Sequence, residues 1–301
     1  MKVGITGSRG LIGRALASEL ARRGDEAVPL ARAPDLAALD GLDAVVHLAG
    51  EPIAKRWTRA QKQAIRVSRI EGTRELATLL GTLRAGPRVL VCASAIGYYG
   101  DRAEDLLDET SARGDGFLAE VVDAWEAAAQ PARDAGLRVA HMRFGIVLSG
   151  EGGALPPLVK PMKMGAGGRI GSGRQWWSWV DLEDVAAALA EAVRDERYHG
   201  AINVVAPEPA RNADFAQALG RALHRPAIMP LPAFAARMML GEMADELLLF
   251  SQRVSPKRLK EIGFRFAYPD LETSLRHALG KSVDGAPKAA GNRSRSKTPR
   301  V

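Results

Sequence analysis

The chain has 301 residues, of which 47% are hydrophobic and 26% charged, and this composition excludes a chain that is disordered throughout. The net charge is +7, but residues 281–301 alone carry +5 of it, so the rest has no broad basic face for duplex binding. We therefore expect no nucleic acid among the partners, and a disordered basic tail at 281–301.

A strand pattern begins at Lys2, which leaves no room for a secretory leader. No apolar stretch approaches the roughly 20 residues that a membrane span requires. The single cysteine, Cys92, lies in the apolar run 89–93 and is expected to be a buried core residue in a reducing compartment. These features predict a cytoplasmic protein with no membrane partner.

Short β-branched runs alternate with helical patterns over the first 200 residues, which is typical of a parallel sheet covered on both faces. Gly24 is placed to end the first helix, and His47 is expected to be a satisfied core residue of the third strand. The expected strands are 2–6, 26–31, 43–50, 88–95 and 137–144, and the expected helices are 11–23, 59–83 and 117–129. The pattern predicts a doubly wound α/β Rossmann sheet.

After residue 145 the sequence is rich in glycine and proline, which predicts a substrate-facing loop region at about 146–178 without a regular sheet. A further βα unit is expected at 179–183 and a strand at 201–205. The rest is helical in pattern, with Asn212 as an N-cap and a core helix at 233–250. We thus expect a cofactor-binding domain at 1–205, a smaller, mainly helical substrate domain at 206–280, and the tail.

A glycine loop joins the first strand to the first helix. Gly7 permits a tight turn, Gly10 lets the backbone approach a pyrophosphate, and Gly13 lets the helix pack closely on the sheet. The helix N-terminus adds unpaired N–H groups and the positive end of its dipole. The predicted cofactor-binding residues of this loop are Gly7, Ser8, Arg9, Gly10, Leu11, Ile12 and Gly13.

The end of the second strand indicates which dinucleotide is bound. An NAD-binding protein presents a carboxylate there to the adenosine ribose, whereas this chain has Arg32, and Arg9 lies in the neighbouring glycine loop. Guanidinium groups pair well with a 2′-phosphate, so the sequence predicts NADP(H) as the cofactor. The segment that closes the third strand is expected to contact the cofactor too, through Leu48, Ala49, Gly50 and Glu51.

Several ordered motifs resemble one protein family. The glycine spacing and the Tyr-Gly pair after Ser94 resemble the extended short-chain dehydrogenase/reductases, and the chain is most similar to the proteins labelled sugar-nucleotide epimerase family or cell-division-inhibitor-like. The motifs are Glu51-Pro52-Ile53-Ala54, Arg56-Trp57-Thr58, Ser68-Arg69-Ile70, Gly97-Tyr98-Tyr99-Gly100, Trp125-Glu126, Ser178-Trp179 and Gly241-Glu242-Met243. The resemblance covers about residues 1–280 and implies a Rossmann domain with a small C-terminal domain.

The resemblance also shows a departure from the superfamily pattern. Its enzymes use a tyrosine and, one helical turn later, a lysine that lowers the tyrosine pKa and holds the nicotinamide ribose. In the helix expected to carry this pair, Phe117 or Leu118 takes the tyrosine place and Val121 or Val122 the lysine place. The usual proton-transfer pair is therefore missing.

Other residues are available for proton transfer. Ser94 ends the fourth strand, where the superfamily has a hydroxyl, although an extra residue in the following loop would put Ala95 there instead. Tyr98 and Tyr99 are the nearest phenols, and Glu120 is a carboxylate on the site helix. The predicted catalytic residues are Ser94, Tyr98, Tyr99 and Glu120.

The glycine-, arginine- and tryptophan-rich segment at 165–179 suits a small polar ligand, with Arg169, Gln175 and Trp177 as predicted substrate contacts. The five histidines have no ligand spacing, so no metal is expected. The leading hypothesis is an NADP-dependent oxidoreductase or epimerase-like enzyme acting on a small polar carbonyl or sugar-type substrate, as a monomer or homodimer. The alternative is a nonenzymatic NADP(H)-binding sensor or regulatory protein.

Overall fold

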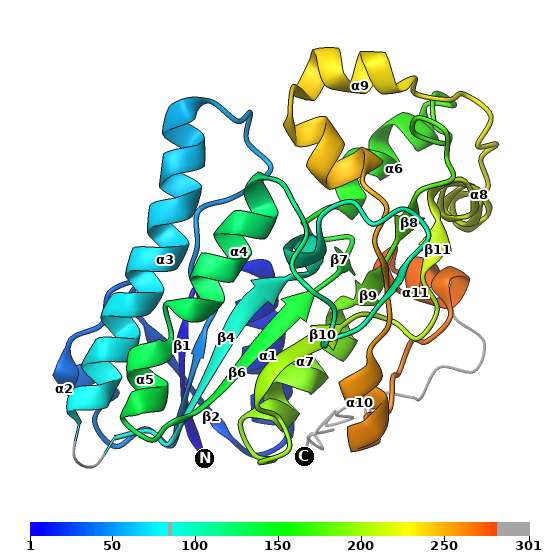
Figure 1. Ribbon diagram of the computed structural model, residues 1–301. Helices are drawn as coiled ribbons and strands as arrows, with labels where there is room; N and C mark the ends of the chain where they lie inside the picture. Colours follow the sequence, from blue (N-terminus) through cyan, green and yellow to red (C-terminus); the bar gives the residue numbers. More distant parts are fainter. Residues whose placement is uncertain (84–85, 282–301) are drawn as a thin grey trace, which may run out of the picture.

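The computed structural model describes residues 1–83 and 86–281, so the tail predicted at 281–301 lies outside the described residues except for Lys281. A six-stranded parallel sheet forms the centre of the molecule (Figure 1), in the order β10-β6-β4-β3-β1-β2. The strands are β1 Lys2–Thr6, β2 Glu26–Leu30, β3 Ala44–His47, β4 Val89–Ala95, β6 Arg138–Phe144 and β10 Gly200–Val204. The doubly wound α/β prediction is confirmed.

Helices cover both faces of this sheet because the strands are apolar on both sides. Leu16 and Leu20 of α1 pack with Val3 and Val46 on one face, and α7 lies on the same face. On the other face Leu80 of α3 lies in a separate core, together with residues of β3 and β4. The flanking helices are α1 Leu11–Arg22, α2 Leu36–Leu39, α3 Arg59–Thr82, α4 Phe117–Ala127, α5 Gln130–Asp134 and α7 Leu182–Ala192.

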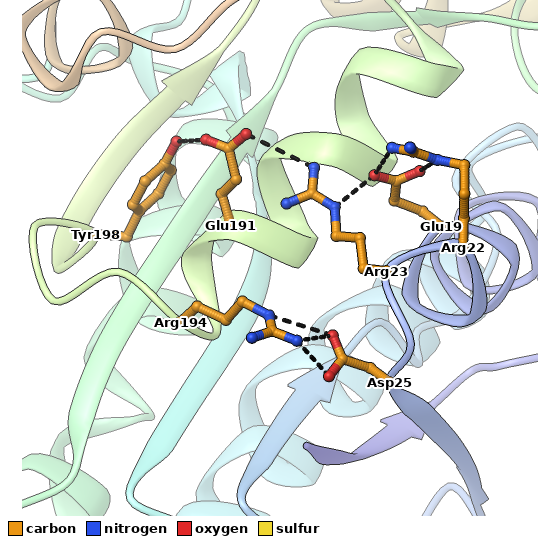
Figure 2. Close-up of polar contacts among 7 residues, drawn as sticks. All are labelled: Glu19, Arg22, Arg23, Asp25, Glu191, Arg194 and Tyr198. Carbon is orange, nitrogen blue, oxygen red and sulfur yellow. Dashed lines mark hydrogen bonds and ion pairs between the residues drawn. The ribbon is translucent and has the colours of Figure 1, made fainter. Parts of the chain in front are cut away.

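A polar cluster fastens the end of α1 to the end of α7 (Figure 2). Asp25 is buried and pairs with Arg194 and with the N-terminal amine, the latter at 2.8 Å. Arg23 binds Glu19 at 2.6 Å and reaches Glu191 of α7 at 3.6 Å. The cluster lies at the end of α1 opposite the glycine loop, so it positions this helix without occupying its N-terminus.

A second hydrophobic core joins the glycine-rich region to the C-terminal part of the chain. Leu155 and Trp177 from the first segment pack with Phe215 and Leu275 from the second. The elements around this core are β7 Ile146–Leu148, α6 Leu155–Lys163, β8 Trp176–Trp177, β9 Trp179–Asp181, β11 Ala210–Arg211, α8 Asn212–Leu223, α9 Ala233–Leu240 and α11 Leu271–Ala278. Mainly helical structure after residue 205 agrees with the prediction.

The prediction of one core helix at 233–250 was wrong. Helix α9 ends at Leu240 because Gly241 has φ +63°, and a single π-helical turn follows at Asp245–Leu249. Met238 and Met239 are 80% and 68% exposed, so the methionine face of α9 is not in the core. The remaining short elements are the 3₁₀ turn Ile96–Tyr99, β5 Leu106–Leu107, β12 Arg253–Val254 and α10 Lys257–Ile262.

Two further expectations need correction. The region 146–178 is not free of sheet structure, since β7 pairs in parallel with β9. Asn212 begins α8 but does not cap it, because its side chain accepts a hydrogen bond from the Ile170 amide at 2.7 Å instead. Among the described residues, none of the helices is long and apolar enough to cross a membrane.

Candidate cofactor and catalytic site

The glycine loop lies at the topological switch point of the sheet. From β1 the chain goes to β2 on one side and then to β3 on the other, and in such sheets ligands bind in the crevice beyond the strand ends at this point. A Cβ atom on Gly7 would stand 2.9 Å from the Ala49 amide, and one on Gly13 would stand 2.4 Å from the Gly7 carbonyl. The loop therefore touches neighbouring backbone at two positions where only glycine fits.

The N-terminus of α1 is open. Gly10 is its N-cap, no side chain caps the helix, and its first turn holds no acidic residue. Its free N–H groups and the dipole favour an anion there. Arg9 and Arg32 are both exposed at this sheet edge, since Thr6 and Leu30 are register partners and each arginine follows within three residues. Ser8, Leu11 and Ile12 are partly exposed around the same turn.

The segment after β3 packs directly against the glycine loop. Thr6 Oγ1 accepts hydrogen bonds from the amides of Leu48 and Ala49 at 3.2 and 3.3 Å, so its own proton is directed at His47 Nδ1, 2.7 Å away. Burial lowers the pKa of His47 to about 4, which keeps the ring neutral. His47 is not the fully satisfied histidine expected, because its Nε2 has no partner among the described residues.

A buried polar network lies below the end of β4, and sequence reasoning missed its central members. The Ser94 hydroxyl donates to Glu126 of α4 at 2.6 Å, and Arg143 of β6 binds both oxygens of that carboxylate at 2.8 Å. Burial opposes the charge on Glu126, but Arg143 outweighs it and lowers the pKa of that carboxyl. The side chain of Ser94 therefore points towards α4 and is buried. The last residue of β4 is Ala95, which has no hydroxyl.

The two tyrosines that follow differ in environment. Tyr99 is fully buried, its hydroxyl donates to Asn203 at 2.8 Å and accepts from Arg143 at 3.0 Å, and burial raises its pKa to about 12. Tyr98 is partly exposed, and the Arg143 guanidinium lies 3.6 Å from its ring centroid. Of the two, only Tyr98 has a hydroxyl without a hydrogen-bond partner in the described part of the chain.

Helix α4 contains neither a tyrosine nor a lysine. Val121 and Val122 are buried, and Phe117 packs edge-on against Trp57 with ring centroids 5.1 Å apart. Glu120 points into solvent, where Arg66 lies 3.2 Å away. Glu120 thus lies on the exposed face of α4, whereas the network of Ser94, Glu126 and Arg143 lies on the buried side.

The three predicted substrate residues have partners within the protein. Arg169 donates to the carbonyls of Gly171 and Ser172 at 2.8 and 2.9 Å. Gln175 and Trp177 are buried and both donate to the Leu248 carbonyl, at 3.0 and 3.2 Å. These contacts shape the second core.

A cavity of about 890 Å³ opens beside the first turn of α1, where Arg14 binds Glu151 at 3.3 Å. Its lining combines Lys160 and Lys163 of α6 with Glu183 and His277. None of the site residues predicted from the sequence lines it. In the described ranges 1–83 and 86–281, there is no group of three or more metal-ligating side chains.

Comparison with known proteins agrees with this architecture. Residues 3–205 match the model of the NAD dependent epimerase/dehydratase family, and residues 231–278 match a domain of unknown function. An epimerase family protein of Mycobacterium bovis is 41% identical, with 92% of this chain and 97% of the relative covered.

Two solved structures are also similar. A human epimerase family protein, SDR39U1, crystallised with NADPH, has a TM-score of 0.87 and 35% identity, with 93% of this chain and 99% of that chain covered. A nucleoside-diphosphate sugar epimerase of Corynebacterium glutamicum has a TM-score of 0.78 and 38% identity, with 93% of this chain and 58% of that chain covered.

Proposed function

The chain belongs to the NAD dependent epimerase/dehydratase family, and from this premise we propose that it binds NADP(H) and exchanges hydride with a small polar carbonyl or sugar-type substrate. The observation that carries the proposal is the uncapped N-terminus of α1, which follows the glycine loop at the switch point of the sheet. A Cβ atom on Gly7 or Gly13 would collide with neighbouring backbone, so these glycines let the loop pack tightly enough to present its amides to a pyrophosphate.

The choice of NADP(H) over NAD(H) rests on charge. Arg9 and Arg32 lie exposed at the ends of adjacent strands, where a 2′-phosphate can receive hydrogen bonds from both guanidinium groups. The human relative was crystallised with NADPH, which supports the same cofactor here. The pyrophosphate would be held by the backbone amides of residues 7–13. Residues 48–51 would contact the cofactor from the end of β3.

When bound, the cofactor supplies or accepts a hydride at C4 of its nicotinamide. The residue we assign to proton transfer is Tyr98, because Ser94 and Tyr99 are engaged inside the protein. The Arg143 guanidinium packs on the Tyr98 ring and holds the phenol in position, so that its hydroxyl can donate a proton to a carbonyl oxygen. Arg143 in turn is held by Glu126.

Calorimetric titration with NADPH and NADH tests the binding proposal, and we expect at least tenfold tighter binding of NADPH. Equal affinity, or tighter binding of NADH, would contradict the assignment of Arg9 and Arg32. The redox proposal is tested by the loss of NADPH absorbance with a panel of aldehydes, ketones and nucleotide sugars. Wild-type protein should oxidise NADPH with at least one of them, and Tyr98→Phe should do so at least tenfold more slowly.

One observation favours a second candidate, a nonenzymatic NADP(H) sensor. The Ser94 hydroxyl is engaged by Glu126, and the described α4 contains neither a tyrosine nor a lysine. NADPH absorbance that persists with the whole panel, while tight binding is retained, would favour the sensor over the enzyme.

A further inference from the structure

Arg69 is a partly buried cation beside the proposed cofactor crevice. It lies on α3, and its Nη1 donates to the Glu51 carbonyl at 3.0 Å. Its guanidinium carbon lies 3.4 Å from where a Cβ atom on Gly50 would be, and 5.1 Å from the Trp125 ring centroid. The Arg69 guanidinium is thus packed between Gly50 and Trp125 of helix α4.

The charge of Arg69 has no counterion in contact. No carboxylate within residues 1–83 and 86–281 forms an ion pair with it, and the nearby Glu51 binds Lys55 at 2.6 Å instead. Burial lowers the pKa of Arg69 to about 10, so the group is still charged near pH 7. Holding an unpaired cation away from water is costly, and that cost is recovered when a ligand accepts its remaining hydrogen bonds.

The order of the strands places Arg69 along the crevice. Arg32 follows β2, the glycine loop follows β1, Gly50 follows β3, and Tyr98 follows β4. An extended dinucleotide with its 2′-phosphate at Arg32 and its pyrophosphate at the loop would have its second ribose on the β3–β4 side of the loop, the side to which Gly50 belongs. This is where the Arg69 guanidinium lies.

We propose that Arg69 donates hydrogen bonds to the nicotinamide ribose of the cofactor and so takes over the ribose-holding role of the missing lysine. The inference rests on the proposed NADP(H) function and extends it to a residue from another helix. Trp125 keeps the guanidinium plane in place, and its own indole N–H is fixed by Thr73 at 2.9 Å. Ser68, the neighbour of Arg69, accepts a hydrogen bond from the Glu51 amide at 3.0 Å and steadies the same loop.

Binding of three probes that share adenosine, 2′-phosphate and pyrophosphate tests this assignment. The probes are 2′-phosphoadenosine 5′-diphosphate, which lacks the second ribose, 2′-phospho-ADP-ribose, which has it, and NADPH. For Arg69→Met we expect about tenfold weaker binding of the two ribose-bearing probes, and a change of less than twofold for the first. Arg66→Met, which removes an exposed cation one turn earlier on α3, should change none of the three.

Equal weakening of all three probes by Arg69→Met would show that the residue only anchors the loop through Glu51, and would overturn the proposal. Unchanged binding of all three would overturn it too. If the Met variant is unfolded by circular dichroism, Arg69→Gln decides, since it keeps a planar N–H donor but lacks the charge and the reach of the guanidinium, and it must lose affinity only for the ribose-bearing probes. Wild-type protein that bound none of the probes would instead contradict the proposed function itself.

Discussion

Glu126 and Arg143 form a buried ion pair in which both carboxylate oxygens accept a hydrogen bond at 2.8 Å. Their side chains are 13% and 4% exposed, so neither charge is solvated if the other is removed. We expect Arg143→Met to destabilise the protein by about 3–5 kcal/mol, because it leaves the carboxylate unpaired. Glu126→Leu combined with Arg143→Met should recover most of that loss, as measured by urea unfolding. A single-variant loss below about 1 kcal/mol would contradict this account.

The close packing of α1 on the glycine loop leaves no room for a side chain at Gly13. We expect Gly13→Ala to abolish measurable NADPH binding, because the new methyl group would lie 2.4 Å from the Gly7 carbonyl. Gly72→Ala is the matched control, since a Cβ there has no neighbour within 4 Å and the residue lies inside α3. The control should bind NADPH normally and be more stable by about 0.5–1 kcal/mol. Calorimetric titration and thermal unfolding of both variants check the pair.

The proposed preference for NADP(H) depends on the charge at the end of the second strand. Arg32→Ala is expected to weaken NADPH binding about 10- to 100-fold and to leave NADH binding nearly unchanged, because only NADPH carries the 2′-phosphate. Arg22→Ala, at the far end of α1, removes the same charge away from the crevice and should alter neither affinity. If Arg32→Ala weakened both nucleotides equally, its role would be general attraction and not phosphate recognition.

His277 gives the stability a pH dependence. Hydrogen bonds to Asp181 at 3.1 Å and Glu183 at 3.2 Å raise its pKa to about 10, and its ring stacks on Tyr268. Since the folded pKa lies above the ordinary value, this stabilisation is complete below about pH 6.5 and is lost as the pH rises towards 10.

The variant His277→Gln should therefore lower Tm by about 2–4 °C at pH 6, and the difference should shrink towards pH 10. The exposed His199 serves as the control, and His199→Gln should show no such trend. A Tm difference that stayed constant between pH 6 and pH 10 would rule out the ion pairs as its cause.

The sequence was sufficient for the parallel sheet because strands buried on both faces leave long apolar runs, as in 43–50 and 88–95. It was insufficient for 233–250, where an apolar pattern continues across Gly241 although the positive φ of that residue ends the helix. The glycine loop could be identified because its chemistry depends on adjacent residues.

The network around Arg143 could not be predicted in the same way. Arg143 and Glu126 lie on different elements, and only the fold brings them and Ser94 together. One signal was present, since Arg143 is a charged residue between the apolar Met142 and Phe144 at the end of the strand. A cation at such a position implies a buried partner.

The C-terminal part of the chain also contacts the first turn of α4. Glu246 accepts hydrogen bonds from the amides of Phe117 and Leu118, both at 2.8 Å, and so caps α4. Glu242 forms an ion pair with Lys62 of α3 in the same region. The C-terminal part of the chain is therefore not an independent module. On another Rossmann sheet it would lack these contacts, and without it the first amides of α4 would lose their hydrogen-bond acceptor.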